Sequence, residues 1–444
     1  MNIIINDDLS FNTRDEYNRK PIAEKIIEIL NSEIPISPMM IDGSWGTGKT
    51  EFCFKLIKLF KESNPEKEII YINAFNEDHT DEPILTLLAS IVNLLPESER
   101  PSLIEKALPA LRFGLKTTLK AGATWVLKQN TDELADEFSD AVQKTSDAAI
   151  DSTITSLIKD HVDSDKNIKA LKSALTEISI KTPMCIFIDE LDRCKPSFAV
   201  SILENIKHVF DVDNVKFVLI TNTQQLQASI NHIYGISLDA KRYLDKFIKF
   251  SFLLPETRIL NSQEEILTSI EHWNYASGQH SLLNKIHEQV ITGIKELIKK
   301  NRLSLREVET LARYIEVYQS LSKEGLGHGI ILGYALYRMI GVYIYCFHRE
   351  VALSISAGDI DTNSIASALN IVKLGYNTEE YPTYIELAFY GILKNYNSET
   401  FHSPNKATEE FLENFYNGLF RGDHYGVGNP IDIIKHAINT MQLK

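Results

Sequence analysis

Residues 41–50 read Ile-Asp-Gly-Ser-Trp-Gly-Thr-Gly-Lys-Thr, and this stretch decides the fold class. Gly43, Gly48, Lys49 and Thr50 fill the G-x-x-x-x-G-K-[ST] pattern of a phosphate-binding loop. Glycines permit backbone angles that turn the loop's N–H groups inward, and the N-terminus of the following helix completes an anion site. In such a loop the lysine reaches the β- and γ-phosphates, and the final hydroxyl ligates Mg²⁺. We call residues 43–50 the phosphate loop.

The residues on both sides of the phosphate loop support this interpretation. Residues 38–41 are short and apolar, as a buried strand should be, and residues 50–60 carry apolar side chains at helical spacing. The chain therefore has the required order of strand, loop and helix. We expect the nucleotide to be bound by the phosphate loop and the residue after it, namely Gly43, Ser44, Trp45, Gly46, Thr47, Gly48, Lys49, Thr50 and Glu51.

A second motif lies at residues 183–193, where an apolar strand ends on two adjacent carboxylates, Asp189 and Glu190. Carboxylates at the end of a buried strand are costly unless a cation meets them. We expect Asp189 to hold the Mg²⁺ shell, together with Thr50, and Glu190 to orient and polarise the attacking water. If Glu190 does not have this role, Asp192 is the first alternative.

Polar residues and cations after the second motif are further candidates. Residues 214–222 read as a buried strand, and Asn222 or Thr221 at its end could sense the γ-phosphate; a simple polar turn is the alternative. The Asn-Lys-x-Asp motif that recognises guanine does not follow this strand, which favours ATP. Arg242 precedes the last strand, predicted within residues 240–255, and could reach a neighbouring subunit's nucleotide, although a surface charge explains it equally well.

Residues 256–444 read as helical throughout. Ser304 is a predicted helix cap, so Arg306 falls in the first turn, where a cation gains nothing from the helix dipole. An anion partner would explain Arg306, and we expect it to contact the γ-phosphate. Residues 330–347 are very apolar but contain Arg338, which favours a buried helix over a membrane span.

Length, charge and cysteine usage limit the function classes. A chain of 444 residues accommodates two or three domains. Its formal net charge of −14 disfavours a broad nucleic-acid-binding face, although a local basic patch is compatible with it. The four cysteines form no C-x-x-C pair, and the N-terminus lacks the pattern of a signal peptide. We expect a cytoplasmic protein.

Residues 96–182 contain no convincing strand and read as a helical insertion. Residues 105–128 form a basic amphipathic pattern, and residues 129–165 are strongly acidic. A helical hairpin with internal charge pairing explains this pattern most simply. The alternative is a helix that contacts a membrane surface or a partner; the charges are too many for a transmembrane segment.

Over roughly residues 7–320 the chain resembles the KAP family of P-loop NTPases. The resemblance depends on the Trp within the phosphate loop, on residues 73–75 (Asn-Ala-Phe), on residues 188–194 (Ile-Asp-Glu-Leu-Asp-Arg-Cys), on residues 217–222 and 243–247, and on Leu305-Arg306. The chain departs from the family at Phe75, where a Trp is usual, and lacks the Pro before Arg306. Family members often carry transmembrane helices between the two nucleotide motifs, where this chain has its charged insertion.

These observations predict a three-layer α/β P-loop NTPase with a parallel sheet of order 5-1-4-3-2. The NTPase domain would span residues 1–255, including the helical insertion 96–182, and an α-helical domain would span residues 256–444. We expect an ATP-hydrolysing switch or motor that acts with partner proteins, and a homo-oligomer is compatible with the sequence. The resemblance implies a role in bacterial defence against phage. The alternatives are a nucleotide-gated scaffold with little turnover and a DNA-directed ATPase.

Overall fold

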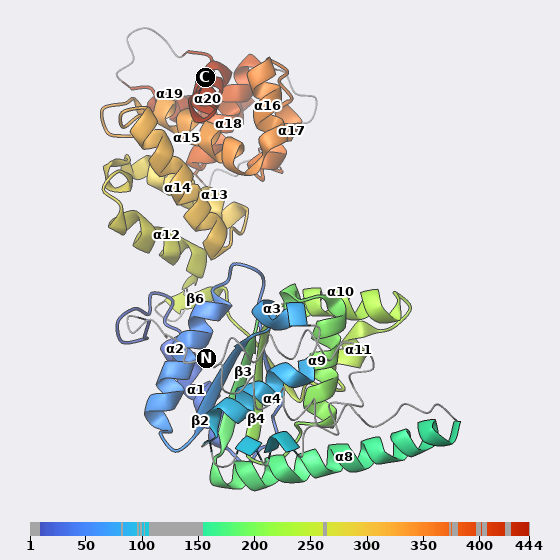
Figure 1. Ribbon diagram of the computed structural model, residues 1–444. Helices are drawn as coiled ribbons and strands as arrows, with labels where there is room; N and C mark the ends of the chain where they lie inside the picture. The colour runs from blue at the N-terminus through green and yellow to red at the C-terminus, as the bar shows by residue number, and fades with distance from the viewer. Residues whose placement is uncertain are drawn as a thin grey trace. The chain divides into compact units, whose positions relative to one another are not determined.

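The computed structural model describes residues 9–80, 83–95, 97, 100–101, 103–105, 154–260, 264–372, 374, 381–396, 401, 406–421 and 428–443. The chain divides into two compact units, Met1–Pro255 and Glu256–Lys444 (Figure 1). The predictions for residues 106–150, including most of the basic amphipathic stretch, lie outside the described residues.

The N-terminal unit is built on a parallel five-stranded sheet with the order β2-β3-β4-β1-β5. This is the predicted order, read from the other edge, so the fold class is confirmed. The strands are β1 (Met39–Asp42), β2 (Glu68–Asn73), β3 (Met184–Asp189), β4 (Val215–Thr221) and β5 (Phe250–Leu253). The main helices around them are α1 (Lys20–Asn31), α2 (Lys49–Ser63), α4 (Pro83–Leu94), α8 (Ile154–Lys181), α9 (Pro196–His208) and α10 (Thr223–Tyr234).

Alternation along the strands produces the three layers (Figure 1). On β3, Ile186 and Ile188 belong to a core shared with α4, α8, α9 and α10, whereas Cys185 and Phe187 belong to a core shared with α1 and α2. Successive strand residues point to opposite faces, so a continuous apolar strand is buried on both sides. Both faces of β3 are therefore covered by helices, as the uninterrupted apolar sequence predicts.

Short elements follow the strands at the edge of the sheet that carries the phosphate loop. They are α3 (Ala74–Glu77), the 3₁₀ turn Asp78–Thr80 after it, and the 3₁₀ turn Leu191–Arg193, whereas the short helix α11 (Ala240–Leu244) follows α10 and precedes β5. In the sequence, residues 68–75 read as one strand, but β2 ends two residues earlier, at Asn73. The Asn73 side chain accepts a hydrogen bond from the Asn76 amide, which caps α3 and ends the strand.

The C-terminal unit begins with an antiparallel pair of strands, β6 (Thr257–Leu260) and β7 (Glu264–Leu267). The prediction that this unit is entirely helical is therefore wrong for its first residues. Each strand has only four residues, too few to establish a period-2 pattern in the sequence. The remaining regular elements are α12 (Thr268–Gln279), a 3₁₀ turn (Leu283–Lys285), α13 (Glu288–Lys300), α14 (Leu305–Leu321), α15 (Leu332–Phe347), α16 (Arg349–Ala357), α17 (Thr362–Ala368), α18 (Tyr384–Asn395), α19 (Lys406–Gly418) and α20 (Pro430–Met441).

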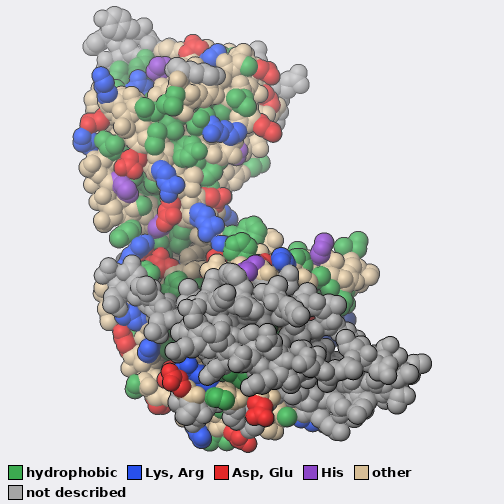
Figure 2. All heavy atoms as spheres, viewed as in Figure 1, with side chains coloured by type: hydrophobic (Ala, Val, Ile, Leu, Met, Phe, Trp, Pro, Cys, Tyr) green, Lys and Arg blue, Asp and Glu red, His purple; other side chains and the backbone are tan. Residues whose placement is uncertain are grey.

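The apolar helix α15 lies in the core of this unit. A Cβ on Gly341 would lie 2.8 Å from both the Ala437 Cβ and the Ile434 carbonyl oxygen of α20, so the two helices approach closely where glycine leaves room. The prediction of a buried helix is confirmed. Within the described residues, no helix is both long and apolar enough to cross a membrane. Figure 2 shows charged side chains of both signs, interspersed with apolar ones, on the visible face of this unit.

Candidate functional site

The phosphate loop has the backbone geometry that its glycines predict. It connects the end of β1 to α2, and Gly46 and Gly48 have φ values of 79° and 80°. Left-handed angles of this kind are costly for residues with a Cβ. At Gly43 an added Cβ would lie 2.9 Å from the Thr47 Oγ1 and 3.3 Å from the Lys49 Cδ. The loop therefore requires glycine at these positions, and it presents backbone to whatever binds there.

Lys49 is buried inside this loop. Its ammonium donates to the Gly43 carbonyl at 2.6 Å and to the Ser44 carbonyl at 3.0 Å. Burial lowers the pKa of Lys49, and the nearby carboxylates of Asp192 and Asp189 oppose that shift. Two carbonyl groups satisfy hydrogen bonds but do not neutralise a buried cation. The phosphate loop thus holds a positive charge that an incoming phosphate would neutralise.

Asp189 ends β3 beside this cation and is 1% exposed. The hydroxyl groups of Thr50 and Tyr71 donate to its carboxylate, the latter at 3.2 Å, and the Glu190 amide donates at 2.8 Å. Burial raises the pKa of Asp189 to about 6, although these hydrogen bonds lower it. A buried carboxylate next to a threonine hydroxyl offers the hard oxygen ligands that Mg²⁺ requires. The pair that the sequence predicts as metal ligands is therefore brought together.

Glu190 lies next along the chain and is held on both sides. Its Oε1 pairs with the Arg193 guanidinium at 2.7 Å, and its Oε2 accepts from the Asn73 side-chain amide at 3.2 Å. The register places Asn73 opposite Asp189, so β2 and β3 end together. Glu190 itself has a φ of 61°, which is unusual for a residue with a side chain and often marks a functional position. Each oxygen of the Glu190 carboxylate therefore interacts with another side chain of the protein.

Asp192 connects the phosphate loop to the neighbouring strand end. Its Oδ2 accepts from the Trp45 indole N–H at 2.5 Å, and its Oδ1 accepts from the Thr221 hydroxyl at 3.2 Å. Trp45 is otherwise half exposed, so this hydrogen bond determines where the indole lies. Sequence reasoning considered Asp192 only as a substitute for Glu190. The two contacts instead connect Asp192 to the phosphate loop and to the end of β4.

Arg19 is a site residue that sequence reasoning missed. The side chain is buried, and it donates to the Thr47 carbonyl at 3.0 Å and to the Pro255 carbonyl at 3.1 Å. Its guanidinium carbon lies 4.8 Å from the centre of the Tyr17 ring. Burial lowers the pKa of Arg19. Arg19 is the residue before α1, which begins at Lys20, and no local pattern distinguishes it from a surface arginine.

The remaining predicted residues are placed as follows. Asn222 caps α10 by accepting from the Gln224 and Gln225 amides, which occupies its Oδ1. Glu51 pairs with Lys55 at 2.7 Å. Arg242 is largely exposed and pairs with Asp239 at 3.2 Å.

Arg306 is exposed in the first turn of α14, where Ser304 forms the predicted cap. The roles of Asn222, Glu51, Arg242 and Arg306 toward a nucleotide remain predictions.

Comparison with known proteins gives two findings. The sequence profile described as the KAP family P-loop domain matches residues 19–322. A protein of Escherichia coli (strain K12), the phage T7 exclusion protein, is 22% identical over 269 residues. That alignment covers 56% of this chain and 34% of the relative, so the chain spans about a third of that protein's length.

Proposed function

The chain belongs to the KAP family of P-loop NTPases, and we propose that it binds ATP with Mg²⁺ and hydrolyses it. The observation that carries this proposal is the buried Lys49 ammonium, which donates to two loop carbonyls and forms no ion pair among the residues that the structure describes. A cation buried without a counter-ion is costly, and a nucleotide phosphate would remove that cost. The absence of a guanine-recognition motif after β4 supports adenine as the base.

The oxygen donors fit a magnesium ion. The Thr50 hydroxyl and the Asp189 carboxylate would hold it, the latter directly or through water. Bound Mg²⁺ neutralises charge on the β- and γ-phosphate oxygens. Residues 43–51 of this chain would bind the phosphates through their backbone N–H groups and the Lys49 ammonium. Glu190 would then orient the water that attacks the γ-phosphate.

A second candidate function, a nucleotide-gated switch with little basal turnover, is favoured by one observation. Arg193 and Asn73 hold the Glu190 carboxylate in one orientation, so turning it toward a water placed elsewhere would break at least one of these contacts. A partner that moves either group would release it. Turnover would then depend on the partner. If the Glu190 carboxylate is never released, the protein is a nucleotide-gated scaffold that binds the nucleotide without hydrolysing it.

We further propose that the switch acts with partner proteins in excluding phage. The name of the phage T7 exclusion protein supports this, within the limits of an alignment over a third of that protein. The described structure includes four free thiols, which suits the reducing cytoplasm. A net charge of −14 gives less support to a DNA-directed ATPase.

Calorimetry tests the nucleotide proposal. Mg-ATP should bind the wild-type chain and Mg-GTP more weakly, and Lys49→Ala should lose most of the affinity because it removes the buried cation. Lys61→Ala, an exposed position on the same helix, is the matched control. Equal affinity in wild type and Lys49→Ala would overturn the site assignment. Plaque counts on cells that express each variant test the role in defence, which requires protection by the wild type and none by Lys49→Ala.

A further inference from the structure

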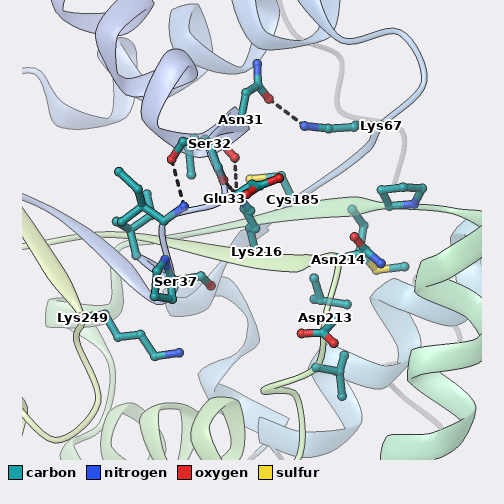
Figure 3. Close-up of a pocket in the computed structure, with 18 of the residues that line it drawn as sticks. Asn31, Ser32, Glu33, Ser37, Lys67, Cys185, Asp213, Asn214, Lys216 and Lys249 are labelled. Carbon is teal, nitrogen blue, oxygen red and sulfur yellow. Dashed lines mark hydrogen bonds between the residues drawn. The ribbon is translucent and has the colours of Figure 1, made fainter.

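A cavity of about 590 Å³ opens at the edge of the sheet opposite the phosphate loop (Figure 3). Its walls are the segments that enter the strands: residues 30–37 before β1, Lys67 before β2, residues 183–185 at β3, residues 211–216 at β4, and Lys249 before β5. Met184 at the start of β3 lines the cavity and Asp189 ends the same strand five residues later, a distance of roughly 17 Å at about 3.3 Å per residue. The cavity is therefore distinct from the nucleotide site.

Three lysines from three different segments line this cavity (Figure 3). Lys216, on β4, is half-buried and donates to the Leu30 carbonyl and, at 3.1 Å, to the Ser32 carbonyl. Lys67 is half-buried and donates to the Asn31 Oδ1 at 2.6 Å. Lys249 is exposed and lies 3.5 Å from Asp211.

Lys67 lies close enough to Lys216 for its charge to act on the Lys216 ammonium. Burial lowers the pKa of Lys216, the Lys67 charge lowers it further, and the buried Cys185 thiol opposes these shifts. Neither lysine forms an ion pair within the part of the chain that the structure describes. Neutral oxygens accept from both ammonium groups, so two neighbouring positive charges are left without a counter-ion.

The acidic residues at the cavity do not supply that counter-ion. Glu33, Asp211 and Asp213 are exposed, and Asp211 faces Lys249. Exposed carboxylates are solvated and gain little by moving to a half-buried lysine. A bound anion with two charges would neutralise both lysines, and lysine is a common phosphate ligand. The cavity volume lies in the range of small-molecule sites and exceeds what a bare ion fills.

We propose that this cavity binds a small organic phosphate, with Lys67 and Lys216 contacting its phosphate group. The site has neither a glycine-rich loop nor a helix N-terminus directed at it, in contrast to the phosphate loop. It therefore holds a ligand through side chains alone, and it goes beyond the nucleotide function proposed above.

Titration calorimetry with a glycerol phosphate tests the proposal, in a Lys49→Ala background that silences the phosphate loop. We expect saturable binding that Lys67→Gln weakens by about tenfold or more, because it removes a charge-assisted contact. Lys61→Gln, a solvated lysine on α2, should leave the affinity unchanged. Lys216→Gln should act like Lys67→Gln, and since it also removes two hydrogen bonds to carbonyl groups at the C-terminal end of α1, its folding is checked by circular dichroism.

Three outcomes would overturn the proposal. They are no saturable heat at roughly millimolar ligand, equal affinity in the Lys67→Gln and parent proteins, and equally tight binding of succinate, which would replace phosphate by a general dicarboxylate preference. None of them depends on ATP hydrolysis. A failure here is therefore separable from a failure of the proposed nucleotide function.

Discussion

Replacing Asp189 by Asn should change how the stability of the ligand-free protein depends on pH. The pKa of this carboxyl is about 6 in the folded protein, against an ordinary value of 3.8. A carboxyl with a raised pKa destabilises the folded state once it is ionised, and the cost is absent below the unfolded pKa. The difference between these two pKa values means that ionised Asp189 lowers the free energy of unfolding by about 3 kcal/mol above roughly pH 7. Near pH 5 the loss is about half of that.

The variant has no ionisable group at this position, so it escapes the pH-dependent cost. It also replaces one carboxylate oxygen by an NH₂ group, which removes an acceptor for a donor such as the Tyr71 hydroxyl at about 1 kcal/mol, but that loss is the same at every pH. The informative measurement is therefore how the stability difference between wild type and Asp189→Asn changes with pH. Between about pH 5 and pH 8 the wild type should lose roughly 1.4 kcal/mol relative to Asp189→Asn, or about 3–6 °C in Tm.

Thermal unfolding followed by circular dichroism, without nucleotide or Mg²⁺, measures this difference. Asp245→Asn is the matched control, since it removes an exposed aspartate at the surface of the same unit. The Tm difference between wild type and Asp189→Asn should grow with pH, while the control difference stays constant. A constant difference for Asp189→Asn would refute the claim that burial raises the pKa of this carboxyl.

Three further substitutions address the control of turnover. Asn73→Ala removes one of the two groups that hold Glu190. Because the lost hydrogen bond contributes ~1 kcal/mol, basal ATP turnover should rise about fivefold. Unchanged turnover in a phosphate-release assay would contradict this. Arg306→Ala should leave ADP affinity intact and reduce the preference for ATP by about 10- to 150-fold, whereas an equal loss for both nucleotides in calorimetry would make Arg306 structural. If Arg242 acts across a subunit interface, mixing Arg242→Ala with Lys49→Ala subunits should partly restore hydrolysis, and no restoration would argue against a trans-acting role.

The sheet and both nucleotide motifs were predictable from the sequence because their chemistry restricts residue type locally. Gly46 and Gly48 take positive φ angles, and Lys49 and Asp189 are polar groups beside buried strands. Apolar runs on both sides of such residues predict covered parallel strands. The strand order followed from the family resemblance, and pairing of β1 with both β4 and β5 confirms it.

Contacts between distant segments could not be predicted in this way. Trp45 and Asp192 are 147 residues apart, and Asn73 and Glu190 are 117 apart, so only the register of the folded sheet brings them together. Arg19 is recognisable as a site residue only after its burial against Thr47 is known. The hairpin of β6 and β7 was missed because four-residue strands carry too little periodicity.

We propose that Glu190 activates water for ATP hydrolysis at the phosphate loop. Multiple-turnover phosphate release from Mg-ATP, measured for wild type and Glu190→Gln beside nucleotide affinity for both, tests it most directly. Glutamine keeps the shape and the hydrogen bond from Asn73 but cannot take a proton from water. We expect intact ATP affinity with turnover reduced at least about a hundredfold in the variant. Near-normal turnover in Glu190→Gln would contradict it.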